Sequence, residues 1–169
     1  TDYVTMPLFP VSLNSNDDNT KILELFRYLG KFVARSMLDN RILDFNFNKA
    51  FFELTHARSR SRCRVNDSAD IQEKLHIISL VDDHLAKSLR YLLDHRENEK
   101  ELEQLTLFFT LPGYELDLVE NGSSVMVTTS NVQKYIELVV DYIIGAGIEK
   151  QLDNFIDGFS DVFPYSSLL

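Results

Sequence analysis

The one cysteine is the first residue of this sequence that could act as a catalytic group. Cys63 stands between Arg62 and Arg64, and their positive charges would favour the reactive thiolate form. However, the surrounding stretch, residues 56 to 70, is polar and is expected to form a loop or insertion. A nucleophile needs rigid partners that orient it, and such a loop supplies none. Catalysis by Cys63 is therefore disfavoured.

The other titratable residues do not form a motif either. None of the histidines pairs with another at i, i+4, so a helical zinc site is unsupported. Asp82 and Asp83 are expected near a helix start, and the carboxylates of residues 97 to 103 are expected to be solvated. Phosphate-binding glycine motifs and the serine-nucleophile motif are absent. We expect no metal, no cofactor and no complete active site, which leaves binding as the favoured class. The histidines are His56, His76, His84 and His95.

Composition and charge restrict the partners. The chain has 169 residues, and 44% of them are hydrophobic. This length and composition suffice for one domain or two small subdomains with a hydrophobic core. The net charge is −9 and the pI is near 4.8. Nucleic-acid binding is disfavoured because it requires a surplus of Lys and Arg, whereas a basic protein surface is a compatible partner. The arginine-rich residues 58 to 64 leave a local anion contact open as an alternative.

The sequence also indicates a compartment. A single cysteine excludes an internal disulfide and suits a reducing environment, so we expect the cytoplasm, the nucleus or both. No apolar run reaches membrane-spanning length, because Asp141 and residues 145 to 147 interrupt the best candidate. No signal-peptide pattern is present. The missing initial Met and the final PYSSLL suggest an excised piece of a larger protein.

The apolar pattern predicts which elements would position a binding site. We expect a small antiparallel sheet in the middle of a mainly helical chain, which is an α+β pattern. Strands are predicted in residues 105 to 111, 114 to 118 and 125 to 127, with a hairpin turn at Asn121-Gly122. Helices are predicted over residues 21 to 38, 47 to 56, 82 to 95, 131 to 144 and 148 to 157, the last ended by Gly158.

The predicted helix over residues 131 to 144 is unusually apolar. Ser130 and Gln133 fit a capping box at its start. Beyond the cap, apolar side chains cover all but one arc of its circumference. Such a helix is either packed on two sides or has a face that a partner covers.

Three segments together resemble the N-terminal lobe of HECT-type ubiquitin ligases. They are FRYLGKFVARSMLDNRILDFNFNKAFFEL (26 to 54), ELDLVENGSSVMVTTSNVQKYIELVVDYI (115 to 143) and IEKQLDNFIDGFSDVFP (148 to 164). Details such as RSMLDNRILDF and LPGYELDL are most similar to the ubiquitin-fusion-degradation branch of that family.

The resemblance implies a mechanism and a division of the chain. In HECT ligases, the N-lobe docks an E2 enzyme carrying ubiquitin, and ubiquitin passes to a cysteine of a separate C-lobe and then to a substrate lysine. Cys63 does not match that cysteine, so the chain alone is expected to be inactive. Residues 1 to 79 and 147 to 169 are expected to form the larger subdomain, with a core of Phe26, Phe32, Phe51, Phe52 and Phe155. Residues 80 to 146 would form a small α/β subdomain that binds the E2.

The resemblance also implies which residues line the E2 groove. These are Leu85, Leu89, Leu92, Leu105, Tyr135, Leu138 and Val139. At Val139 some relatives carry an aromatic residue, which suggests a different E2 preference. The expected partners are an E2, ubiquitin and, through other regions, a substrate protein marked for proteasomal degradation.

Two other functions remain open at this stage. The first is a helical scaffold or adaptor that binds a protein partner without ubiquitin chemistry. The second is a hydrolase that uses Cys63, which predicts unusually fast labelling of that thiol by an electrophile.

Overall fold

The computed structural model describes residues 7–14, 17–61, 70–114 and 116–168. The chain divides into two compact units. The first comprises Thr1–Ala69 and Ile143–Leu169, and the second comprises Asp70–Tyr142. Within the described part, no helix combines the length and the apolar character needed to cross a membrane.

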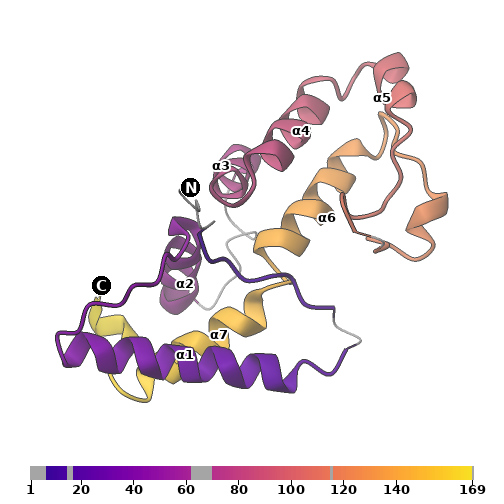
Figure 1. Cartoon of the computed structure of the whole chain (residues 1–169). Coiled ribbons are helices and arrows are strands. Elements are labelled where there is room, and N and C mark those ends of the chain that lie inside the picture. The colour runs from indigo at the N-terminus through magenta and orange to yellow at the C-terminus, as the bar shows by residue number, and fades with distance from the viewer. Residues whose placement is uncertain (1–6, 15–16, 62–69, 115, 169) are drawn as a thin grey trace, which may run out of the picture. The chain divides into compact units, whose positions relative to one another are not determined.

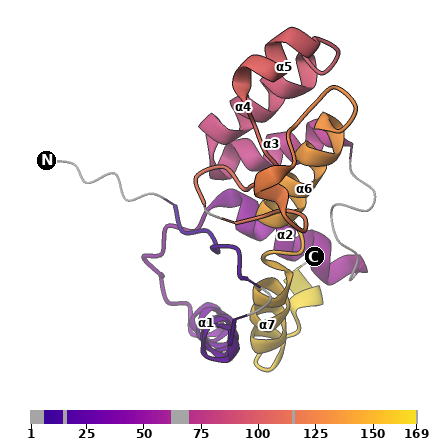
Figure 2. The same cartoon turned by 90° about the vertical axis from the view of Figure 1, so that its right-hand side faces the viewer.

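Helix packing organises the first unit. Its elements are α1 (Thr20–Leu38), α2 (Lys49–Ser61), α7 (Glu149–Ser160) and the short 3-10 helix η3 (Tyr165–Leu168). The main packing partner of α1 is α7, and the two helices lie side by side in Figures 1 and 2. The prediction that Gly158 ends a helix is wrong. This glycine lies inside α7, where an added Cβ would meet the backbone of Arg27 on α1.

Aromatic rings fill the core of the first unit. Phe51 and Phe155 are buried as predicted, and their ring centroids lie 4.9 Å apart in an edge-to-face arrangement. Phe26 is half-buried. Two other predicted core residues are on the surface, since Phe32 is 51% and Phe52 is 43% exposed. The predicted aromatic core is therefore correct at its centre and wrong at its edge.

The second unit is helical as well. Its elements are α3 (Ile71–Val81), α4 (Asp83–Asp94), α5 (Glu99–Leu105), the 3-10 helix η2 (Gly122–Ser124) and α6 (Val132–Ile144), whose last residues reach the boundary with the first unit. Helices α3 and α4 pack on each other, and Asp82 separates them. The predicted helix over residues 82 to 95 is confirmed. Helix α5 was not predicted, because its sequence EKELEQL presents too few apolar residues for a visible stripe.

The predicted α+β class is wrong. In the described residues, β-pairing of the second unit is limited to two isolated antiparallel bridges, Phe108 with Met126 and Thr110 with Asp117. The segment between residues 107 and 111 does hydrogen-bond to two neighbours, since Val127 N–H donates to Leu107 O and Leu118 N–H donates to Phe109 O, both at 2.8 Å. The first predicted strand does not develop because the chain bends at Phe109, where Thr110 N–H donates to Phe108 O at 2.7 Å.

The turns that replace the sheet have backbone signatures. Thr106, Gly113 and Asn121 all have positive φ values, of 48°, 81° and 54°. The predicted hairpin turn at Asn121-Gly122 instead opens the 3-10 helix η2. A positive φ ends regular structure, so the chain changes direction at each of these three residues.

Helix α6 begins differently from the prediction. The hydroxyl group of Ser130 pairs with that of Thr128 at 2.8 Å, and the Gln133 amide donates to Glu137, so no capping box forms. Asn131 fixes this turn instead. Its side-chain oxygen accepts from Thr128 N–H at 2.7 Å, and its amide donates to Met126 O at 3.0 Å.

Candidate functional site: a helical docking surface

Helix α4 carries three of the seven predicted groove residues. The Asp82 carboxylate accepts from Leu85 N–H at 3.0 Å and so caps the helix start. Leu89 and Leu92 are 1% and 5% exposed, and Leu85 is half-buried. The buried face of α4 therefore holds the unit together, whereas Leu85 reaches the surface in part.

Helix α6 carries three more of these residues, and its interior is tightly packed. Tyr135 is 2% and Val139 is 0% exposed, whereas Leu138 is half-buried. The Tyr135 ring meets Phe109 edge-to-face at 5.6 Å, and its hydroxyl donates to Thr110 O at 3.4 Å. Burial raises the pKa of the Tyr135 phenol. Packing inside the chain is thus sufficient to explain the apolar sequence of α6.

Helix α5 places the seventh residue, Leu105, on the surface. Leu102 anchors the helix at 2% exposure, whereas Leu105 at its end is 42% exposed. Glu99 and Glu103 are exposed on the same short helix. A half-exposed leucine beside carboxylates can offer an apolar contact to a partner whose surface is basic.

The sequence analysis missed Tyr91. This α4 residue is 44% exposed, and its ring stacks on His95 with centroids 4.1 Å apart. The Nδ1 atom of His95 lies 2.8 Å from Tyr91 O, and its Nε2 atom lies 3.4 Å from a Glu101 carboxylate oxygen. His95 therefore connects α4 with α5. The signal that could have revealed Tyr91 is its position away from the leucine stripe of α4.

The structure separates the predicted groove into inner and outer residues. In the described part of the second unit few large hydrophobic side chains are exposed, and among them the groove prediction named only Leu105. The buried members can shape a surface from beneath, but contact requires the outer ones. The buried members are Leu89, Leu92, Tyr135 and Val139; the partly or largely exposed members are Leu85, Leu105 and Leu138.

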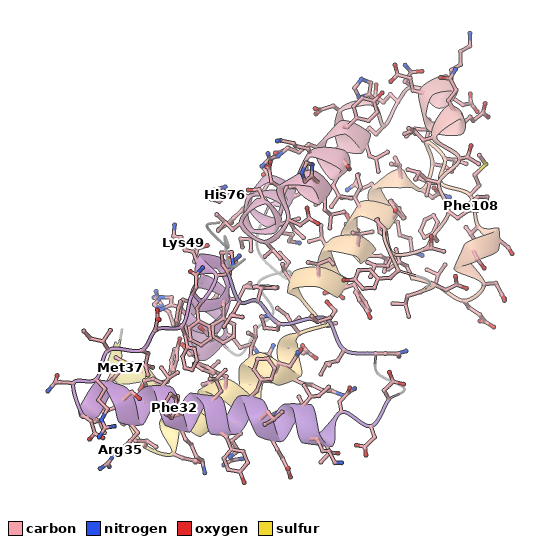
Figure 3. All side chains as sticks on the ribbon, viewed as in Figure 1. Phe32, Arg35, Met37, Lys49, His76 and Phe108 are labelled. Atoms are coloured by element: carbon pink, nitrogen blue, oxygen red, sulfur yellow. The ribbon has the colours of Figure 1, made fainter. Side chains whose placement is uncertain are left out.

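Side chains that could bind a metal ion are dispersed over the described residues. Groups of three or more His, Cys, Asp and Glu placed to hold a metal ion are absent from this part of the chain. One histidine of this part of the chain, His76, lies exposed on α3 (Figure 3). Cys63 and the arginines beside it lie outside the described residues.

Comparison with known proteins identifies the family. A model of the family described as HECT-domain (ubiquitin-transferase) matches residues 4–169. The chain belongs to the HECT family. It is 50% identical over 169 residues to ubiquitin fusion degradation protein 4 of Saccharomyces cerevisiae, covering 99% of this chain and 11% of that protein. The resemblance inferred from the three sequence segments is confirmed.

Other relatives in the HECT family are also similar to this chain over most of its length. A probable ubiquitin fusion degradation protein of Schizosaccharomyces pombe is 39% identical, with 98% of this chain and 10% of that protein covered. The E3 ubiquitin-protein ligase TRIP12 of Danio rerio is 30% identical, with 88% of this chain and 8% of that protein covered. The HECT chain described here therefore spans about a tenth of the length of these curated relatives.

Proposed function

We propose that this chain is the N-lobe part of a HECT E3 ubiquitin ligase and that its second unit docks an E2 enzyme charged with ubiquitin. The observation that carries the proposal is the family match over residues 4–169, since relatives that contain this segment are named E3 ubiquitin-protein ligases. The location of the protein and the degradation of its substrate are proposed on the same basis, the names of the relatives. The cytoplasm or nucleus is the expected location, and the ubiquitin-fusion-degradation names support degradation of the substrate.

In the proposed reaction this chain positions the partners and the parent protein supplies the nucleophile. A thiolate of the C-lobe attacks the thioester carbonyl of the charged E2, and the E2 thiolate leaves. A neutral lysine amine of the substrate then attacks the carbonyl of the new thioester. The C–N amide bond forms as the C–S bond breaks, and the C-lobe cysteine leaves as a thiolate that takes up the proton lost by the amine. The contribution of the N-lobe is proximity, because a docked E2 presents its thioester at high effective concentration.

Docking is proposed to use the outer residues of the second unit. Leu105 supplies the most exposed apolar contact, with Leu85 and Leu138 as half-buried neighbours in the predicted groove. The acidic side chains of α5 would attract a basic E2 surface and accelerate the encounter. Leu89, Leu92, Tyr135 and Val139 would fix the shape of the groove from inside.

The scaffold alternative keeps one specific observation in its favour. Four of the seven groove residues are buried, as in an ordinary core. A scaffold would use the same helices without any affinity for E2 enzymes. Measurement of E2 binding separates the two functions.

The test is a titration of the isotope-labelled chain with a panel of E2 enzymes, followed by NMR. The variants are Leu105→Ala and, as a matched control, Tyr114→Ala, whose side chain is 59% exposed in the same unit. Loss of a contact residue weakens binding by about tenfold or more, because truncation of an interface anchor costs over ~1.4 kcal/mol. The control is expected to bind like the wild type. A folded chain that binds no E2, or binds equally as Leu105→Ala, would contradict the proposal.

A further inference from the structure

Thr106 has an unusual backbone conformation. Its φ and ψ are 48° and 46°, which lie in the left-handed helical region. Glycine enters this region freely and asparagine enters it readily, but a β-branched residue is an outlier there. The other described residues with positive φ follow that rule, since they are Asn40, Asn121 and Gly113. Thr106 is the only β-branched residue among them, so its backbone is the most strained.

The strain at Thr106 is maintained from both sides. Before it, α5 is anchored by Leu102, which is 2% exposed, and the N–H of Thr106 donates to Glu103 O at 3.2 Å. After it, Leu107 O accepts a hydrogen bond from Val127 N–H at 2.8 Å. The chain ends α5 here and turns toward the segment that lies beside α6 (Figure 1). A strained conformation persists where the surrounding structure determines it in this way.

The fold alone does not explain a threonine at position 106. Helices that end in a left-handed residue usually have glycine or asparagine there. Either residue would end α5 at the same place with less strain. Strained residues are concentrated at functional sites, where stability is lowered in favour of binding or catalysis.

The residue before Thr106 supplies a function for the strain. Leu105 is 42% exposed and is the most exposed apolar contact of the proposed docking surface. Thr106 is exposed beside it. The Thr106 hydroxyl lies 3.5 Å from Glu103 O and 3.5 Å from Gln104 O, so it is turned back toward the end of the helix. The methyl group occupies another side of Cβ, where it can extend the apolar surface of Leu105.

We propose that Thr106 is a second contact residue for the E2 and that it fixes Leu105 in its exposed position. This inference rests on the proposed docking of an E2 by the second unit. The Thr106 methyl group and the Leu105 side chain form one apolar contact, which fits an apolar side chain on the E2 surface. The turn holds both groups in place before the E2 arrives. Such preorganisation increases affinity, because less conformational freedom is lost on binding.

The test compares stability with E2 affinity in variants of the 169-residue chain. Thr106→Gly and Thr106→Asn relieve the strain and remove the methyl group, and each should raise Tm by about 2–4 °C. Both should bind the E2 about fivefold more weakly in a titration followed by NMR. Thr106→Val keeps the strain and the methyl group, so its affinity should stay within about twofold of the wild type. The control is Asn121→Gly, a change at a left-handed residue outside the proposed contact, which should leave E2 affinity unchanged.

Opposite changes of stability and affinity support the inference, because a residue with only a structural role changes both in the same direction. Wild-type affinity in Thr106→Gly and Thr106→Asn would overturn the inference and leave the proposed E2 docking standing. A lower Tm in both variants would overturn it as well, since Thr106 would then carry no strain. Binding by Thr106→Val as weak as that of Thr106→Gly would exclude the methyl contact. A wild-type chain that binds no E2 would refute the docking itself, and the inference with it.

Discussion

Gly30 of α1 and Gly158 of α7 each lie against the backbone of the opposite helix. A Cβ added at Gly30 would approach Phe159 N to 2.7 Å, and one added at Gly158 would approach the carbonyl carbon of Arg27 to 2.7 Å. Backbone atoms cannot rotate away as the end of a side chain can. The close packing of α1 on α7 therefore depends on the absence of two side chains.

Alanine at either glycine should destabilise the first unit. We expect Gly30→Ala and Gly158→Ala each to lower the free energy of unfolding by about 2–4 kcal/mol, since overpacking outweighs the ~1 kcal/mol that alanine contributes to helix propensity. Urea unfolding followed by circular dichroism measures the change. Gly113→Ala is the control, because nothing lies within 4 Å and only its φ of +81° opposes a side chain. A loss at Gly30 no larger than the control's would contradict this account.

Arg58 connects α2 with α7 through a partly buried ion pair. Its guanidinium donates twice to Asp153 at 2.7 Å and lies 3.5 Å from Glu149, and its side chain is 16% exposed. Arg58→Ala should lower the free energy of unfolding by about 1–2 kcal/mol, because a bidentate pair is lost whose guanidinium is largely buried although Asp153 is 44% exposed. Arg35→Ala, which removes an exposed pair, should cost about 0.5 kcal/mol or less. Equal effects in urea unfolding would show that burial does not strengthen the Arg58 pair.

The helices of this fold could be predicted where their stripes are strong. Helices α1 and α4 have regular apolar spacing and appear within a residue of the expected bounds. The sheet could not be predicted correctly. Alternating apolar residues between 105 and 127 favoured strands, but the chain has positive φ at Thr106, Gly113 and Asn121, and sequence indicates such values poorly outside glycine.

The family could be predicted from sequence, but the exposure of the site could not. Leu105 and Leu89 belong to the same predicted groove, yet one is 42% and the other 1% exposed. Periodicity identifies the apolar side of a helix, but it does not distinguish a core-facing leucine from one at the edge. Phe32 was assigned to the core together with the other phenylalanines because of its residue type, yet it is 51% exposed.

Asn131 should contribute more to the start of α6 than Ser130 does. Its side chain makes two hydrogen bonds, to Thr128 N–H and to Met126 O. Asn131→Ala should cost about 1–2 kcal/mol in unfolding free energy, because a half-buried N–H and carbonyl lose their partner. Ser130→Ala removes one exposed hydroxyl contact and should cost about 0.5 kcal/mol. A larger loss of unfolding free energy for Ser130→Ala than for Asn131→Ala would contradict this prediction and favour the capping box that the sequence suggested.

Two buried tyrosines predict a loss of stability at high pH. Burial raises the pKa of Tyr135 above its ordinary 10.0, and burial raises the pKa of Tyr165 against the opposing effect of its hydrogen bond with Thr55. The unfolded chain therefore releases these protons first as pH rises. The stabilisation is fully present below about pH 10 and is lost above it, with a slope that approaches ~1.4 kcal/mol per pH unit for each tyrosine.

Phenylalanine variants isolate this contribution from the lysines that also titrate at high pH. Tyr135→Phe removes the titrating group while keeping the ring contact with Phe109, and Tyr165→Phe removes the 2.8 Å bond to Thr55. Each variant should have a flatter dependence of unfolding free energy on pH above 10 than the wild type. Tyr28→Phe, at a residue 65% exposed, should leave the dependence unchanged. Identical slopes in all four proteins would mean that both buried phenols ionise in the folded state as readily as in the unfolded chain.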